Sequence, residues 1–215
     1  MKAVIFRSHG GPEVLEYTDV PDPQVGAGQV LVRVKACAVN HLDIWIRQGL
    51  PAYRIALPHI SGCDVAGVVE RVGSGVTGLA IGDRVVLAPG ISCRTCAWCR
   101  AGQDTLCERY RIRGATTDGG YAQFTLADAQ DALALPAQVP FEEAAAFPLV
   151  FVTAWHMLMA RAGLRAGETV LIHAAGSGVG HAAVQIAKHH HARAISMCHA
   201  VTNTRGNAAA SSKGT

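Results

Sequence analysis

Short runs in which hydrophobic and polar residues alternate fill the first part of the chain. In residues 30–36, valine or alanine occupies every even position, while arginine and lysine occupy two of the odd ones. This period of two is typical of a strand with one buried face. Glycine turns such as Val72–Gly75 and Ile81–Arg84 separate the runs between Lys2 and about Leu126, and glycine supplies the positive φ angles that tight connections need. The pattern predicts an all-β, barrel-like region.

The pattern changes to helical spacing after Pro140. Glu142 and the alanines that follow it predict a helix ending near Gly163, where a C-terminal glycine is expected. We expect its apolar stretch, residues 144–155, to be buried.

A strand, a glycine-rich turn and a second helix come next. The continuous apolar run 170–172 predicts a strand within 168–173, and residues 179–188 carry apolar positions at helical spacing. Another short strand is predicted at 194–197. Small and polar residues dominate from 202 to 215, so we expect a disordered tail.

Composition narrows the class of protein. The chain has 215 residues, of which 50% are hydrophobic, so it can bury a substantial core. Its formal net charge is only +3 and no dense basic stripe is present, which argues against nucleic acid as a partner. No apolar stretch reaches the roughly 20 residues of a membrane span, and we recognise no export signal. We therefore expect a cytoplasmic protein whose cysteines stay reduced and are available to hold a metal.

Four of the cysteines are closely spaced. Gaps of two, two and seven residues separate Cys93, Cys96, Cys99 and Cys107, a spacing that lets one loop wrap four thiolates around a zinc ion. Four thiolates leave no position for water, so such a zinc is structural. An iron–sulfur cluster is the competing interpretation, but the fourth cysteine is too distant and no proline follows it. Four unmetallated thiols are disfavoured because they would be exposed to oxidation.

The cysteine loop occurs together with four other segments, which are Pro58–Val69, Gly82–Val85, Glu142–Trp155 and Ala174–Gly180. In this order, over about residues 1–195, they resemble the zinc-type alcohol dehydrogenases and quinone oxidoreductases of the medium-chain dehydrogenase/reductase superfamily. The resemblance implies a GroES-like β-barrel domain followed by interdomain helices and a partial Rossmann dinucleotide-binding domain. The corresponding boundaries are 1–128, with the structural-zinc loop at 93–107, then 129–198, and a disordered tail at 199–215.

The resemblance also implies which branch of the superfamily the chain follows. Enzymes with a catalytic zinc place a cysteine where this chain has Asn40, a histidine where it has Cys63, and a third ligand near Leu149. Asparagine and leucine are not zinc ligands, and we interpret Cys63 and Asp64 as a partly buried thiol and a hydrogen-bonded carboxylate. The departure favours the quinone-reductase-like branch, for which the resemblance implies hydride transfer from NADPH to a carbonyl, quinone or enone.

Three residues receive roles from that resemblance. Asn40 is a candidate catalytic residue that donates a hydrogen bond to a developing oxyanion. Thr153 is a second candidate, beside the nicotinamide, and His41 is a candidate for approaching the pyrophosphate. The alternatives are that Asn40 caps a helix, His41 is a solvated turn residue and Thr153 is a satisfied core hydroxyl.

The glycine-rich turn supplies the remaining cofactor-binding candidates. A turn between strand and helix brings backbone amides to a pyrophosphate at the positive helix end, and the residues are Gly176, Ser177, Gly178, Val179 and Gly180. The glycines depart from a strict GxGxxG, because counting from Gly176 places the last one at His181. Beyond Ile195 the resemblance ends, so we expect a C-terminally truncated or frameshifted product. Its unpaired strand edge makes a homo-oligomer a candidate assembly.

Two hypotheses follow from these residues. In the first, the chain is an NADP(H)-dependent oxidoreductase acting on a small molecule, with one structural zinc and no catalytic zinc. In the second, it is a catalytically inactive remnant that serves as a zinc-binding GroES-like module.

Overall fold

The computed structural model describes residues 1–51 and 54–197. The chain forms two compact units, one from Met1 to Leu149 and one that begins at Val150. The tail predicted to be disordered, 199–215, lies outside the described residues. No helix among the residues described is long and apolar enough to cross a membrane.

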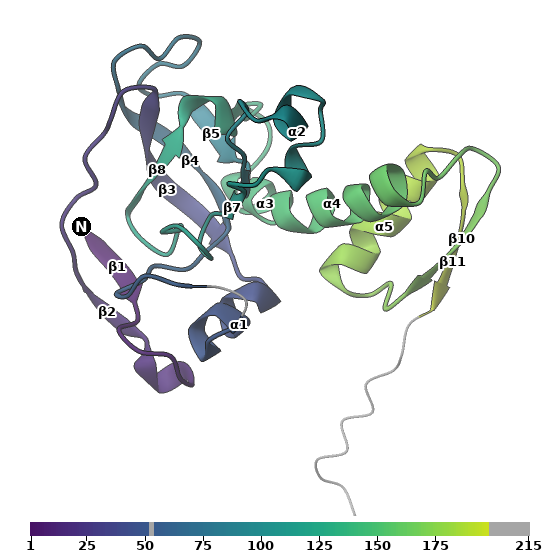
Figure 1. Ribbon diagram of the computed structural model, residues 1–215, viewed down its shortest axis with the longest axis horizontal. Helices are drawn as coiled ribbons and strands as arrows, with labels where there is room; N and C mark the ends of the chain where they lie inside the picture. The colour runs from purple at the N-terminus through teal and green to yellow at the C-terminus, as the bar shows by residue number, and fades with distance from the viewer. Residues whose placement is uncertain (52–53, 198–215) are drawn as a thin grey trace, which may run out of the picture. The chain divides into compact units, whose positions relative to one another are not determined.

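The first unit is mainly β-structure (Figure 1). Its strands are β1 (Lys2–Ile5), β2 (Glu16–Asp19), β3 (Gln29–Ala38), β4 (Asp64–Val72), β5 (Arg84–Leu87), β6 (Gly90–Ile91), β7 (Arg111–Ile112), β8 (Phe124–Asp128) and β9 (Ala132–Ala134). Its helices are α1 (His41–Gln48), α2 (Ala97–Arg100) and α3 (Phe141–Ala145), with short 3-10 turns at η1 (Pro12–Val14), η2 (Asp104–Leu106) and η3 (Ala129–Asp131).

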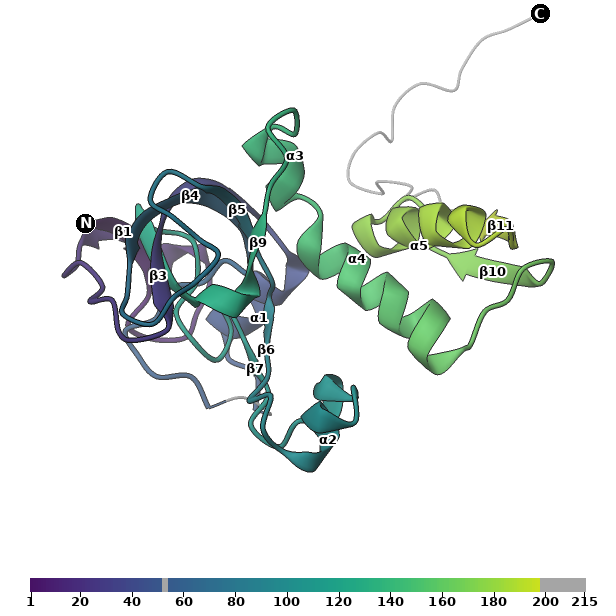
Figure 2. The same ribbon diagram turned by 90° about the horizontal axis from the view of Figure 1, so that it is seen from above.

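A curled antiparallel sheet builds the core of this unit. Its five strands follow the order β8-β3-β4-β5-β9, and Figure 2 shows β3, β4 and β5 curving around the interior. The alternation predicted for 30–36 is partly visible in burial, since Val30 and Val32 are fully buried while Arg33 and Lys35 are exposed. The inward side chains form one cluster, which contains Val30, Val32, Val65, Val69, Val85, Leu87, Ala127 and Ala132. The predicted barrel-like β region is therefore confirmed as a half-barrel.

The first unit extends beyond the predicted boundary at residue 128. Strand β9 pairs with β5 at the edge of the sheet. Helix α3 packs against the sheet through Ala144 and Ala145, which form a cluster with Ala66 of β4. These contacts place residues 129–149 with the β domain.

The single long helix expected after Pro140 is divided. Helix α3 ends at Ala145, α4 runs from Pro148 to Trp155, and η4 (His156–Arg161) continues as a π-helix up to the positive-φ Gly163. Proline has no N–H to continue a helix but fits the first turn of a new one, so Pro148 starts α4. The expected burial was also wrong in part, because Phe147 and Trp155 are about half exposed, at 53% and 50%.

The second unit is a strand–helix–strand arrangement. Strands β10 (Thr169–His173) and β11 (Arg193–Met197) pair in parallel, and α5 (Gly178–His189) connects them. The apolar face of α5 packs on the strands and on η4 through a cluster that contains Leu158, Ile172, Ala182, Ala183 and Ile186. A parallel pair joined by a helix is the building block of a dinucleotide-binding sheet, so the predicted partial Rossmann domain is confirmed.

Candidate functional site

The four spaced cysteines gather in the excursion between β6 and β7. Cys96 precedes α2, Cys99 lies in it and Cys107 follows η2, and Figure 2 shows α2 at the tip of this excursion. The four Sγ atoms all lie within 4.8 Å of one another. Among the residues that the structure describes, this is the group of histidine, cysteine and acidic side chains that could hold a metal ion.

The distances fit a tetrahedral metal site. Cys93 Sγ lies 3.9 Å from Cys99 Sγ, and Cys96 Sγ lies 3.5 Å from Cys99 Sγ. Sulfur atoms around a zinc ion at about 2.3 Å are roughly 3.8 Å apart, whereas a disulfide joins them at about 2.05 Å. The cluster is therefore able to bind a metal and is not a pair of disulfides.

Backbone N–H groups and a hydroxyl surround the sulfur atoms. The Cys96 N–H donates to Cys93 Sγ at 3.3 Å, and the Thr95 hydroxyl lies 3.6 Å from the same sulfur. Hydrogen bonds from the Thr95 backbone and hydroxyl, followed by that of Cys96, lower the pKa of Cys93 to about 5. Desolvation raises the pKa of Cys99 to about 11, so a cation is needed before all four sulfur atoms are thiolates at neutral pH.

An ion pair connects the cysteine loop to the β domain. Arg94, which has a positive φ of 59°, pairs through its guanidinium with the carboxylate of Asp131. Asp131 is only 2% exposed and lies in η3, directly before β9. The loop is thus tied to the edge of the five-stranded sheet.

Asn40 belongs to a second polar group in the first unit. Its Nδ2 donates to Asp64 Oδ2 at 2.9 Å, and the Leu149 N–H donates to Asp64 Oδ1 at 2.9 Å. Asp64 is 1% exposed, and burial raises the pKa of this carboxyl to about 6 despite the two hydrogen bonds. Cys63 beside it is fully buried, and burial raises the pKa of its thiol. The interpretation of Asp64 as a hydrogen-bonded carboxylate agrees with this geometry. Cys63, which we expected to be partly buried, is fully buried.

Asp43 is a structural centre that the sequence analysis missed. Its carboxylate accepts hydrogen bonds from the Asn40 N–H at 2.7 Å, the Tyr121 hydroxyl at 2.7 Å and the Gly62 N–H at 3.1 Å. Burial and the hydrogen bond to Asp43 raise the pKa of Tyr121. The pattern Asn40-x-x-Asp43 resembles a helix capping box and could have identified the start of α1. In the structure, Asn40 lies at the N-cap of α1.

His41 and Thr153 lie on different helices. His41 is exposed in the first turn of α1, with its ring 4.8 Å from the ring of Trp45. Thr153 lies in α4 of the second unit and is half-buried. Their proposed contacts with a cofactor stay predictions.

The glycine-rich turn joins β10 to α5 in the second unit. Ser177 is the N-cap of α5, and its Oγ accepts a hydrogen bond from the Gly180 N–H at 3.1 Å. A Cβ at Gly180 would lie 2.3 Å from the Ala174 carbonyl oxygen, so glycine is required for the helix to pack closely on the strand end. Gly176, Ser177 and Gly178 are exposed, which leaves the turn accessible to a ligand. The spacing that departs from GxGxxG thus still forms the expected strand–turn–helix.

Comparison with known proteins identifies the family. The alcohol dehydrogenase GroES-like domain family matches residues 26–137, which include the curled sheet and the cysteine loop. The chain belongs to this family. As a medium-chain dehydrogenase/reductase it is 40% identical over 190 residues to an alcohol dehydrogenase of Schizosaccharomyces pombe, covering 86% of this chain and 53% of that protein.

The chain is also similar to a quinone oxidoreductase and to a solved alcohol dehydrogenase structure. A quinone oxidoreductase of Rattus norvegicus is 37% identical over 191 residues, covering 88% of this chain and 50% of that protein. The crystal structure of an NAD-dependent alcohol dehydrogenase superposes with a TM-score of 0.89 at 49% identity, covering 93% of this chain and 58% of that one. The chain thus spans about half the length of the curated relatives it matches.

We predict that Asp64→Asn changes the pH dependence of stability in a defined window. The folded-state pKa of Asp64 is about 6 against an ordinary value of 3.8. The folded wild-type protein therefore holds this proton more tightly, and its stability should fall as pH rises from about 4 through 6. The uncharged variant should lack this loss, which amounts to roughly 3 kcal/mol for a shift of this size.

Urea denaturation of both proteins at a series of pH values from 4 to 7.5 measures this difference, with the exposed Asp104→Asn as the matched control. The free-energy difference between Asp64→Asn and wild type should move in favour of the variant across the window. A difference that stays constant with pH contradicts the assignment.

Proposed function

We propose that this chain is the GroES-like and partial nucleotide-binding part of an NADP(H)-dependent oxidoreductase of the quinone-reductase type. It would transfer a hydride to a quinone, enone or carbonyl without a catalytic zinc. The observation that carries the proposal is the hydrogen-bonded group of Asn40, Asp64 and the Leu149 N–H. An amide and a backbone N–H stand where the zinc-dependent members of the family would have ligands, and the buried carboxylate is already engaged by both.

Asn40 can take part in the proposed reaction through the second N–H group of its side-chain amide. An amide nitrogen carries two N–H groups, and one of them is directed at Asp64 Oδ2. The other can donate to an oxyanion that develops on the substrate, with its orientation fixed by the first. Because Asp64 and the N-cap position hold Asn40 in place, little reorganisation is needed when charge develops.

The second unit would bind the dinucleotide at the exposed turn before α5. Bound NAD(P)H supplies the hydride. The chain supplies Gly176 and Gly178, which let a pyrophosphate approach the backbone, and the positive N-terminal end of a twelve-residue helix. Thr153 and His41 are the further proposed cofactor contacts.

We propose zinc as the metal of the cysteine cluster, with a purely structural role. The soft four-thiolate donor set and the sulfur–sulfur distances support this choice. The ion would offset part of the charge of the four thiolates and stabilise the folded loop without taking part in hydride transfer. We also propose that the protein is cytoplasmic and that it forms a homo-oligomer.

Removing one cysteine tests the structural zinc. Cys96→Ser should reduce bound zinc from one ion per chain to a level below detection and lower Tm by at least about 5 °C, because the metal stabilises the folded loop. Elemental analysis and calorimetry measure both quantities. Thr105→Ala, an exposed change in the same loop, should alter neither. A Cys96→Ser protein that keeps one zinc and an unchanged Tm refutes the assignment.

Titration with NADPH and NADH tests the nucleotide site. The zinc-loaded full chain should bind NADPH saturably in the micromolar range, and Gly176→Val should abolish binding because a branched side chain blocks approach to the turn. Gln185→Ala, an exposed change further along α5, is the matched control. If the folded chain binds neither nucleotide, the result supports the alternative hypothesis of an inactive zinc-binding GroES-like module.

Replacing Asn40 with serine tests the oxyanion donor separately from the helix cap. Serine is as good an N-cap residue as asparagine but lacks the two amide N–H groups. In NADPH-dependent reduction of quinones, Asn40→Ser should lower kcat on the order of a hundredfold while the Kd for NADPH stays unchanged. Unchanged kcat in the variant shows that Asn40 does not stabilise the reacting oxygen.

A further inference from the structure

Asp64 is a buried carboxyl group in which each oxygen faces one donor. Oδ2 accepts a hydrogen bond from Asn40 Nδ2 and Oδ1 accepts one from the Leu149 N–H, both at 2.9 Å. Within residues 1–51 and 54–197, no cationic side chain forms an ion pair with Asp64. A carboxylate that is buried without a cation is costly, so Asp64 is a group that can take up a proton while the protein stays folded.

The titratable groups around Asp64 come from neighbouring elements of the first unit. Burial raises the pKa of Asp64 to about 6, and the negative charge of Asp43 on α1 acts in the same direction. Cys37 lies on β3, and Cys63 directly precedes β4. Burial raises the pKa of Cys37 to about 12 and also raises the pKa of Cys63. Both thiols are therefore uncharged in the range where Asp64 takes up its proton.

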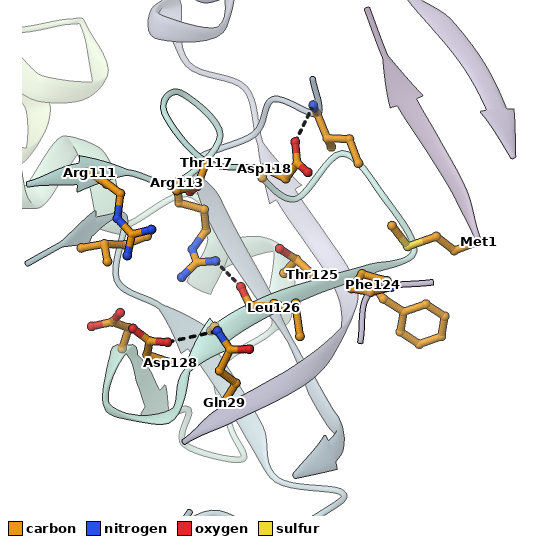
Figure 3. A pocket seen from close by; sticks show the side chains of 16 residues that line it. Met1, Gln29, Arg111, Arg113, Thr117, Asp118, Phe124, Thr125, Leu126 and Asp128 are labelled. Carbon is orange, nitrogen blue, oxygen red and sulfur yellow. Dashed lines mark hydrogen bonds between the residues drawn. The ribbon is translucent and has the colours of Figure 1, made fainter. Parts of the chain in front are cut away.

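A buried cation is present in the same unit, but it has another partner. Arg113 follows β7 and is 1% exposed. Its Nη1 donates to the Leu126 carbonyl oxygen at 2.6 Å, as Figure 3 shows. Its Nε and Nη2 make no hydrogen bond within the part of the chain that the structure describes. Arg113 therefore does not hold Asp64 in the ionised form through an ion pair.

A proton on Asp64 changes what its Oδ2 can do. The Leu149 N–H keeps Oδ1 as an acceptor, so a proton from solvent adds to Oδ2, which becomes an O–H donor. This O–H and the Asn40 N–H would then be two donors facing each other. Rotation of the Asn40 amide by half a turn removes the conflict, because its carbonyl oxygen takes the place of the nitrogen and accepts the new hydrogen bond.

We propose that Asp64 is a positioning residue whose protonation state sets the orientation of the Asn40 amide. When Asp64 is ionised, the amide nitrogen faces it, and the second N–H of that nitrogen is held in a fixed direction. When Asp64 is protonated, the nitrogen turns away and this donor is lost. The consequence for a substrate oxyanion rests on the proposed function, whereas the coupling between the two side chains does not.

Nuclear magnetic resonance of the full, zinc-loaded, ¹⁵N-labelled chain tests this coupling without nucleotide or substrate. The side-chain NH₂ signals of Asn40, assigned by their loss in Asn40→Ser, should shift between pH 5 and 7.5 with a midpoint near 6. They should not depend on pH in Asp64→Asn, because an amide does not titrate there. His41→Gln removes the exposed histidine beside Asn40 and should leave the titration in place. Signals that stay constant in wild type, or that shift equally in Asp64→Asn, overturn the proposal.

The pH profile of quinone reduction tests the consequence for the reaction. With NADPH as the reductant, wild-type kcat should fall about tenfold per pH unit well below pH 6, because the competent fraction follows the ionised form of Asp64. Asp64→Asn should present an N–H to Asn40 at every pH, so its kcat at pH 7.5 should be lower on the order of a hundredfold, with an unchanged Kd for NADPH. The exposed Asp104→Asn should follow the wild-type profile.

The two experiments separate this proposal from the proposed function. Turnover with a profile that stays flat through pH 6 refutes the positioning role of Asp64 and leaves the oxidoreductase intact. Absence of turnover at every pH, together with an Asn40 amide that titrates through Asp64, refutes the oxidoreductase and supports the coupling of the two side chains.

Discussion

The arrangement of the polar residues Asn40 and Asp64 depends on the hydrogen bonds that the carboxylate of Asp43 accepts. This carboxylate holds three donors from three separate segments, namely the start of α1, the residues before β4 and the residues before β8. A buried carboxylate is tolerated only when its acceptor positions are used, so these segments must meet in one arrangement. Asn40 and Asp64 stand at the ends of two of them. Their mutual hydrogen bond is therefore a consequence of how Asp43 is satisfied.

The buried charges of this protein are accommodated in different ways. Asp43 is stabilised by three donors, whereas Asp64 has two, and the neighbouring charge of Asp43 adds to burial in raising the pKa of Asp64. The cysteine loop directs N–H groups at sulfur and gathers four soft ligands for a cation. Arg113 satisfies one nitrogen and leaves one edge unmatched. The buried charges among the described residues are thus satisfied to different degrees.

Local patterns predicted the features that local chemistry determines. The spacing of Cys93 to Cys107 was sufficient to predict four sulfur atoms around one point, because a short loop brings such cysteines together. The apolar run before the glycine-rich turn likewise predicted β10, the turn and α5. Pro148 is a local signal of the same kind, because proline fits the first turn of a helix but not its interior, and α4 begins at this residue.

Local sequence patterns do not predict the contacts between residues that are far apart in the chain. The hydrogen bond from Tyr121 to Asp43 joins residues 78 positions apart, and no local pattern pairs them. Arg113 lies in a segment of arginine, glycine and threonine that is typical of a solvated loop, and only the packing of β8 and its neighbours buries it. The role of Asn40 in holding Asp64 follows from the same tertiary arrangement.

The strand order of the half-barrel also determines when the first unit can fold. Its two edge strands, β8 and β9, are the last of the sheet to be synthesised, and β8 pairs with β3 through partners as distant as Gln29 and Asp128. Such non-local pairing makes folding slow, because closing a long loop costs conformational entropy before the stabilising contacts between the strands can form. On the ribosome, the ladder of β3, β4 and β5 would wait with open edges until Ala134 has emerged. In the second unit β10 and β11 pair over a much shorter separation, as between Thr169 and Arg193, so this strand–helix–strand can form soon after its own residues leave the exit tunnel.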